Sequence, residues 1–269
     1  MTNLSQRIIV ALLGVLIIIS AIMWGPWTYF VIFFIICLLS ILEFYKLSGL
    51  DGYVPLKTWG SVSGMLIYTL LYLDMMDLIT GKIYLIIFPV SAVIFFIKLY
   101  KRSDEKPFSN IAYTYLGIIY VAVPFSLLHI IAFYNGTYNF EIVIGILCLT
   151  WASDTGGYFA GTHFGRTKLF ERISPMKSWE GFLGGLIFAI LIAYALSHFF
   201  SILPLWKWIG CGFITVIAGT YGDLVESLFK RSIKIKDSGT MLPGHGGFLD
   251  RFDAMLLSIP FVAAFLILL

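Results

Sequence analysis

Charged residues are scarce in this sequence. Asp, Glu, Lys and Arg make up only 12% of its 269 residues, whereas 59% of the residues are hydrophobic. Soluble domains carry about 25% charged residues, so this composition excludes an ordinary water-soluble protein. The sequence also lacks a long polar block that could fold as a separate soluble domain. The chain is therefore predicted to be an all-α integral membrane protein with a single polytopic domain, 1–269.

Several motifs of soluble enzymes and metal sites are missing as well. Cys37, Cys148 and Cys211 lie singly within apolar segments, without the paired spacing of a zinc or redox site. There is no phosphate-binding glycine loop ending in Gly-Lys-Ser/Thr, no dinucleotide-binding glycine pattern and no His-Glu-x-x-His pair. A Gly-x-Ser-x-Gly nucleophile motif is also lacking. The sequence therefore shows no clear candidate for the nucleophile of a covalent mechanism.

Apolar segments of bilayer length are abundant. A bilayer core of about 30 Å needs about 20 apolar residues per helix, and somewhat fewer where flanking residues extend to the interface. By this criterion the sequence contains nine candidate transmembrane helices, at 8–24, 27–43, 58–73, 83–99, 112–134, 141–162, 180–203, 207–228 and 250–269. The first follows Arg7 as a signal peptide would, but it has no small-residue cleavage site and is interpreted as a retained span.

The basic residues indicate an orientation. If the N-terminus lies in the cytoplasm, all of the 18 Lys and Arg residues except Lys82 and Lys207 fall on the cytoplasmic side. Such a bias is typical of membrane proteins. The sequence therefore predicts a cytoplasmic N-terminus and an external C-terminus. Residues 1–140 are interpreted as N-terminal helices, and residues 141–269 as the catalytic helices with their cytoplasmic loops.

Acidic residues within the predicted spans gather near the cytoplasmic face. They are Asp154 in the sixth span, Asp223 and Glu226 in the eighth, and Asp250 and Asp253 at the start of the ninth. The members of each pair are three residues apart and share a helix face. Because ionisable groups cost about 3 kcal/mol in a membrane helix, they indicate a functional site. For any single acid, an ion pair with a neighbouring arginine is the structural alternative.

The loop at 163–179 adds basic residues before the seventh span. Ser178 is placed to cap that helix, with Glu180 in its first turn. A helix N-terminus flanked by Arg172 and Lys177 is also suited to binding an anion. The two interpretations are compatible.

The stretch from Ser227 to Asp253 concentrates charge and glycine. It contains basic residues, acidic residues, a histidine and four glycines: Lys230, Arg231, Lys234, Lys236, Arg251, Asp237, Asp250, Asp253, His245, Gly239, Gly244, Gly246 and Gly247. Basic residues beside glycines suit phosphate groups, and clustered carboxylates suit a divalent cation. The pattern predicts a phosphorylated substrate with Mg²⁺. For the histidine, phosphate binding, orientation of a metal ligand and a purely structural role all remain open.

This stretch resembles the signature of the CDP-diacylglycerol synthases, also called phosphatidate cytidylyltransferases. The resemblance lies in Ser-x-Phe-Lys-Arg at 227–231, Lys-Asp-x-Gly at 236–239 and Leu-Pro-x-His-Gly-Gly-Phe-x-Asp-Arg-Phe-Asp at 242–253. Weaker support comes from Ser-Asp-Thr at 153–155, Arg-x-Ser-Pro-x-Lys-Ser-x-Glu-Gly at 172–181 and Gly-Asp-x-x-Glu-Ser at 222–227. The similarity covers about 150–269, and the first five spans resemble the family only in being membrane helices.

The resemblance implies the reaction of CTP with phosphatidate to give CDP-diacylglycerol and pyrophosphate. A lipid phosphate oxygen would attack the α-phosphorus of CTP directly, with Mg²⁺ and, as an open alternative, a second cation. The implied location is the cytoplasmic face of the inner, or plasma, membrane. CTP, phosphatidate and membrane lipids are the expected partners, no nucleic acid is expected, and a homodimer is left open.

Residue roles follow from this resemblance and from side-chain chemistry. Catalytic roles are expected for Asp223, Lys236, Asp237, Asp250 and Asp253. The metal ligands among them are expected to be Asp223, Asp237, Asp250 and Asp253. Substrate binding is expected of Arg172, Lys177, Ser178, Lys230, Arg231, His245, Gly246, Gly247 and Arg251. Asp154 and Glu226 are expected to support the ligands.

Two other functions fit the sequence less well. A CDP-alcohol phosphotransferase would carry an Asp-Gly-x-x-Ala-Arg stretch, which the sequence lacks. A transporter coupled to cations or protons would use acidic residues near the middle of the membrane. Here the acids lie toward one face, beside basic loops.

Overall fold

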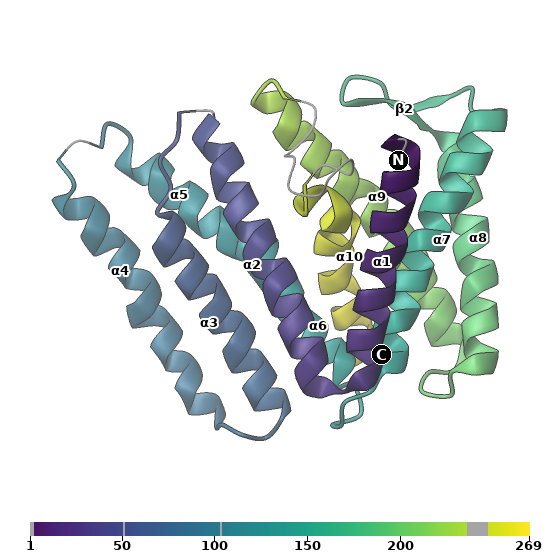
Figure 1. Cartoon of the computed structure of the whole chain (residues 1–269), viewed down its shortest axis with the longest axis horizontal. Coiled ribbons are helices and arrows are strands. Elements are labelled where there is room, and N and C mark those ends of the chain that lie inside the picture. The colour runs from purple at the N-terminus through teal and green to yellow at the C-terminus, as the bar shows by residue number, and fades with distance from the viewer. Residues whose placement is uncertain (1–2, 51, 103, 236–246) are drawn as a thin grey trace. The chain divides into compact units, whose positions relative to one another are not determined.

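The computed structural model describes residues 3–50, 52–102, 104–235 and 247–269, and in these ranges the chain is almost entirely helical (Figure 1). The 3₁₀ turn η1 (Gly81–Ile86) runs directly into α4 (Ile87–Tyr100), and the π turn η2 (Ile118–Ala122) joins α5 (Pro107–Gly117) to α6 (Val123–Ala132). The helices are α1 (Asn3–Trp24), α2 (Pro26–Leu50), α3 (Lys57–Met75), η1 (Gly81–Ile86), α4 (Ile87–Tyr100), α5 (Pro107–Gly117), η2 (Ile118–Ala122), α6 (Val123–Ala132), α7 (Phe140–Phe164), α8 (Trp179–Phe199), α9 (Leu205–Ser232) and α10 (Leu249–Leu268). The strands are β1 (Lys168–Phe170) and β2 (Ser174–Ser178).

The predicted all-α membrane fold is confirmed. Counting η1 with α4 and α5 with η2 and α6, the described residues form nine helical segments, one for each predicted span. Seven of them are long and apolar enough to cross a membrane, and α1 and α3 are the other two. The main differences are at helix ends. The predicted second span stops at Glu43, but α2 continues to Leu50 because helical backbone hydrogen bonds persist beyond the apolar stretch. The predicted orientation remains a prediction.

The chain forms two compact units. The first comprises 1–130 with 237–251, and the second comprises 131–236 with 252–269. Each unit is therefore assembled from segments distant in sequence, and α10 begins in the first unit and ends in the second.

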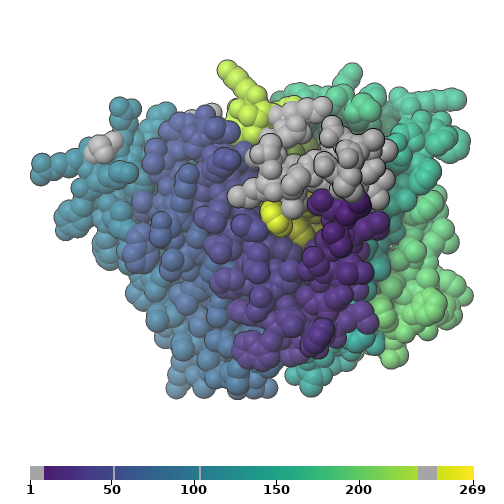
Figure 2. All heavy atoms as spheres, in the orientation of Figure 1, coloured from purple at the N-terminus to yellow at the C-terminus, as the bar shows by residue number. Residues whose placement is uncertain are grey.

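In the first unit, α2 supplies much of the core. Its Tyr29, Phe33 and Tyr45 are fully buried. Tyr45 donates a hydrogen bond to the Thr114 carbonyl at 2.7 Å. A Cβ at Gly60 of α3 would lie 2.2 Å from the Tyr45 hydroxyl, so only glycine lets the two helices approach this closely. By contrast, α1 lies at the surface (Figure 2), where large apolar side chains such as Leu12, Leu13 and Leu16 are exposed, as expected for contact with lipid.

A buried polar cluster joins two connecting segments of the first unit. The Lys98 ammonium contacts the Asp104 carboxylate and donates to the Val54 carbonyl at 2.8 Å. The Asn110 amide donates to Asp104 at 2.6 Å, and its oxygen accepts the Val54 N–H at 2.7 Å. The side chains of Lys98 and Asp104 are only 1% and 4% exposed. The cluster thus fixes the segments that lead into α3 and α5.

The second unit is built on close contact between α7 and α8. A Cβ at Gly184 would lie 2.2 Å from the Ala160 Cβ, and a Cβ at Gly156 would lie 2.7 Å from the Gly184 carbonyl oxygen. Such small residues let membrane helices pack backbone against backbone. The two helices are connected by the hairpin of β1 and β2, which lies at one end of the unit.

Asp104→Ala is expected to destabilise the first unit by about 3 kcal/mol, because it leaves the buried Lys98 ammonium without its counter-charge. Burial raises the pKa of Asp104, but hydrogen bonds from Lys98, the Lys106 N–H and Asn110 outweigh it and hold the pKa below its ordinary value. The stabilisation is therefore full above about pH 4 and is lost as the pH falls through the lowered pKa.

The measurement is thermal unfolding of the purified protein in detergent, with the exposed neighbour substituted in Glu105→Ala as the control. Equal unfolding temperatures for Asp104→Ala and the control at neutral pH would contradict the assigned role of this ion pair.

Candidate active site

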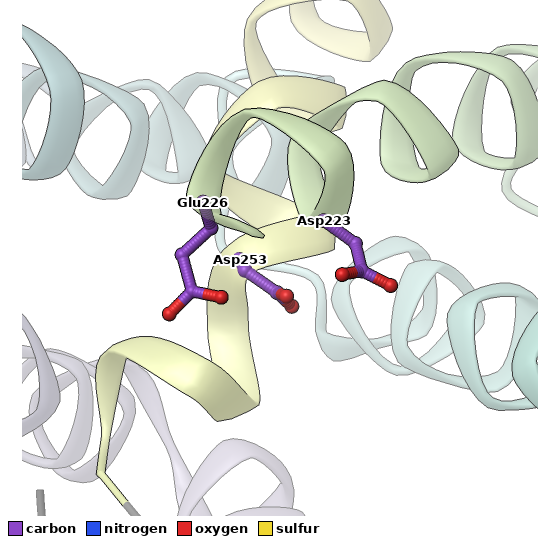
Figure 3. Close-up of side chains that lie close together, drawn as sticks. All are labelled: Asp223, Glu226 and Asp253. Atoms are coloured by element: carbon purple, nitrogen blue, oxygen red, sulfur yellow. The ribbon is translucent and has the colours of Figure 1, made fainter. Parts of the chain in front are cut away.

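Three acidic side chains of the second unit lie close together (Figure 3). Asp223 and Glu226 come from α9, and Asp253 comes from α10. One carboxylate oxygen of each lies within 4.8 Å of the others. The spacing of three residues between Asp223 and Glu226 places both on the face of α9 that meets α10, as the sequence predicts. Glu226 is completely buried.

Two lysines face these carboxylates. Lys230, one turn after Glu226 on α9, forms an ion pair with it at 2.6 Å. Lys177, from the end of β2, forms an ion pair with Asp223. The Ser227 hydroxyl donates to Asp223 at 3.3 Å, and Asp253 accepts the N–H of Ala254 at 2.7 Å. Because like charges this close repel strongly away from bulk water, the cluster requires nearby cations.

The cluster fits a divalent cation. Mg²⁺ and Ca²⁺ prefer carboxylate oxygens, and Mg²⁺ is held in enzymes by one or two carboxylates together with water or substrate phosphate. Three oxygens within 4.8 Å can meet this requirement with small side-chain adjustments. Asp223, Glu226 and Asp253 are thus the residues of the described chain that could hold such an ion.

A β-hairpin brings Lys177 to the cluster. β1 pairs antiparallel with β2, and the Trp179 N–H donates to the Thr167 carbonyl at 2.9 Å. The Glu180 carboxylate accepts the N–H groups of Arg166 and Thr167, each at 3.1 Å, and so closes the hairpin at its base.

The predicted cap of the following helix is confirmed. The Ser178 hydroxyl accepts the Gly181 N–H at 3.1 Å, at the N-terminus of α8. Arg172, which was grouped with this anion-binding interpretation, lies exposed in the turn of the hairpin.

A cavity of about 260 Å³ opens beside the cluster. Its polar lining comes from α7, β2 and α9 and includes Ser153, Asp154, Lys177, Ser178, Thr220 and Asp223. A second cavity, of about 210 Å³, lies between the hairpin, α8 and α9 and has an aromatic lining that includes Phe170, Trp179 and Tyr221. Both cavities are lined by Leu169, Phe182 and Thr220, so they adjoin one another.

The structure brings together part of the predicted site. Asp223, Asp253, Glu226, Lys177 and Lys230 meet in the cluster, and Asp154 lines the adjoining cavity. Glu226, predicted as a supporting residue, stands among the three carboxylates that could bind the ion.

Other predicted residues lie elsewhere or are not described. The Asp250 carboxylate, in the first turn of α10, accepts the Gly247 N–H at 3.2 Å. Arg231 and Arg251 are exposed, and Arg231 donates to the Ile235 carbonyl at 3.5 Å. Lys236, Asp237, His245 and Gly246 lie outside the described residues, and their roles remain predictions.

Two acidic residues near the predicted site were given no role in it by the sequence. Glu180 closes the base of the hairpin, although the sequence suggested only a place in a helix cap. Glu43 of α2 is 2% exposed and accepts the N–H of Phe248. The position of Glu43, an acidic residue at the end of an apolar span, indicates a special role. The sequence could not show its contact with Phe248, because the two residues are 205 positions apart in the chain.

Comparison with known proteins supplies the family. A model of the cytidylyltransferase family matches residues 5–269. The chain belongs to this family. The resemblance noted in the C-terminal half is thereby confirmed and extended to the N-terminal helices, so this member of the cytidylyltransferase family is a membrane enzyme with several apolar helices.

Individual relatives agree with the family. A phosphatidate cytidylyltransferase of Haemophilus influenzae is 42% identical over 137 residues, which are 49% of this chain and 46% of that protein. One from Staphylococcus aureus strain COL is 35% identical over 167 residues, 61% of this chain and 62% of the relative. These two matches span only about half to three fifths of the relatives. One from Bacillus subtilis is 30% identical over 272 residues, 97% of both chains.

Proposed function

We propose that this cytidylyltransferase-family member transfers the CMP moiety of CTP to phosphatidate, giving CDP-diacylglycerol and pyrophosphate. The observation that carries the proposal is the meeting of Asp223, Glu226 and Asp253 beside Lys177 and a polar cavity. Such a combination of carboxylates and ammonium groups suits a reaction between two phosphorylated substrates. The relatives named as phosphatidate cytidylyltransferases support this choice of substrates.

The proposed reaction is a direct displacement. A phosphate oxygen of phosphatidate forms a bond to the α-phosphorus of CTP, and the bond from that phosphorus to the bridging oxygen of the β-phosphate breaks. The electron pair leaves with pyrophosphate. The atoms balance without a protein nucleophile, so the protein has to orient the substrates and neutralise their charge.

The acidic and the basic residues of the site have different proposed roles. Asp223, Glu226 and Asp253 would hold a divalent cation, which when bound neutralises charge on the reacting phosphates. Lys177 and Lys230, already next to these carboxylates, are within reach of phosphate groups bound there. Asp237 and Asp250 remain proposed as further ligands, and a second cation remains part of the proposal.

The second cavity suits the lipid part of phosphatidate. Glycerol is a short link between the phosphate and the acyl chains, so a phosphate at Lys177 places an acyl chain close by. The cavity lined by Phe170, Trp179 and Tyr221 adjoins the polar one and is apolar enough for that chain. We place one acyl chain of phosphatidate there.

The proposed setting is the cytoplasmic face of the inner membrane. The basic residues of the loops favour that side for the hairpin and for the end of α9. CTP is a cytoplasmic nucleotide, while phosphatidate reaches the site from the bilayer. The arrangement agrees with a membrane enzyme that receives one substrate from water and one from lipid.

The function is tested by incubating the purified protein in detergent with CTP labelled at the α-phosphorus, Mg²⁺ and dioleoyl-phosphatidate. Label is expected in the organic phase only when phosphatidate and metal are both present. Asp253→Asn is expected to lower the rate by about 10³-fold. The reason is that loss of this carboxylate weakens binding of the cation that stabilises the charge of the transition state.

Glu141→Gln, which alters an acid at the opposite end of α7, is the matched control and should retain the wild-type rate. Failure of the folded wild-type protein to transfer label would contradict the proposed function. Full activity of Asp253→Asn would contradict the proposed role of the cluster.

The placement of the acyl chain is tested separately, with phosphatidate that carries a photoactivatable group in one chain. Crosslinked peptides are expected from 168–182 and 217–224, which line the apolar cavity. Labelling confined to helices of the first unit would exclude this placement.

A further inference from the structure

A buried carboxylate of α2 has no part in the site described above. Glu43 is 2% exposed and lies in a strongly apolar helix, in which the nearby residues Ile41 and Tyr45 are also buried. A carboxylate in such surroundings is costly unless it is hydrogen-bonded. The Glu43 carboxylate therefore needs a hydrogen-bond donor close to it.

One partner of Glu43 is the backbone at the start of α10. A Glu43 carboxylate oxygen accepts the N–H of Phe248 at 2.8 Å. Phe248 directly precedes Leu249, the first residue of α10, so this N–H is at the helix N-terminus. Helix N-termini leave backbone N–H groups without partners inside the helix and favour negative charge. A hydrogen bond to a carboxylate is also stronger than one to a neutral acceptor.

Two further hydrogen bonds fix the same turn. The Asp250 carboxylate accepts the Gly247 N–H at 3.2 Å, and the Arg251 N–H donates to the Phe248 carbonyl at 3.0 Å. The backbone from Gly247 to Arg251 is therefore held from within by Asp250 and from a distant helix by Glu43. From this turn, α10 continues without interruption to Leu268 and carries Asp253 one turn later.

We propose that Glu43 is a positioning residue, which anchors the first turn of α10, where Asp250 lies and from which the helix continues to Asp253. The proposal rests on the proposed function, because it gives Glu43 a role in the same transfer reaction. The carboxylate acts through the Phe248 N–H and does not touch substrate. Of the two properties of the side chain, an acceptor oxygen is essential to this role and the negative charge strengthens it.

The experiment compares Glu43→Ala, Glu43→Gln and Ser40→Ala in the purified full-length protein. Ser40 is the matched control because it is fully buried on the same helix, about one turn before Glu43. The first readout is amide hydrogen exchange in peptides covering 247–252, which needs neither substrate nor metal. Glu43→Ala is expected to speed exchange there by about tenfold, since the anchoring bond is lost. Glu43→Gln should stay within threefold of wild type, and Ser40→Ala should not change.

The second readout is steady-state kinetics of label transfer. Glu43→Ala is expected to lower kcat by at least tenfold with the KM for CTP within about twofold of wild type, and Glu43→Gln should restore most of kcat. A structural role alone would give proportional loss of folded protein with unchanged kcat per folded molecule.

Unchanged exchange at 247–252 in Glu43→Ala would overturn the proposal. Faster exchange spread equally over α2 and α3 would also overturn it, because the residue would then be part of general packing. If wild-type protein transferred no label, the proposed function would fail, whereas the exchange result would still decide whether Glu43 anchors α10.

Discussion

Mutual repulsion of three carboxylates is the constraint on which the site depends. Asp223, Glu226 and Asp253 have oxygens within 4.8 Å of one another, and Glu226 is fully buried. In such surroundings, negative charges are tolerated only beside positive ones. Lys230 supplies one from the same helix, and Lys177 supplies another from the hairpin. The arrangement therefore couples α9, α10 and the hairpin through electrostatics. It also forms a site that could bind a divalent cation.

This coupling explains the local structure of the hairpin. Lys177 can face Asp223 only if β2 ends at the start of α8, and three features secure this: β1 pairs with β2, Ser178 caps α8, and Glu180 binds the backbone at 166–167. Asp253 lies in the second turn of α10, and Glu226 lies within the last two turns of α9. In the proposed reaction, such a position would suit substrates that arrive at a membrane face, whereas a transporter would use acids near mid-membrane.

Much of the fold and part of the candidate site could be predicted from local features of the sequence. The apolar segments predicted nine helices because bilayer thickness fixes their length, and the three-residue spacing of Asp223 and Glu226 predicted a shared face. What could not be predicted depends on contacts between distant segments. The Glu43 contact with Phe248 joins residues 205 positions apart, and the orientation of Asp250 toward Gly247 depends on backbone geometry at a helix start. The predicted end of α2 is also too early, because the apolar stretch ends before the backbone hydrogen bonding of the helix does.

The central claim is that the carboxylates of α9 and α10 bind the divalent cation. Its most direct test is binding of Mn²⁺, followed by electron paramagnetic resonance, to the purified protein without substrate. The account predicts that Asp223→Asn and Asp253→Asn each weaken Mn²⁺ binding by at least tenfold, while Glu141→Gln binds as the wild type does. Unchanged Mn²⁺ affinity in both aspartate variants would contradict it and would move the metal to other residues of the chain.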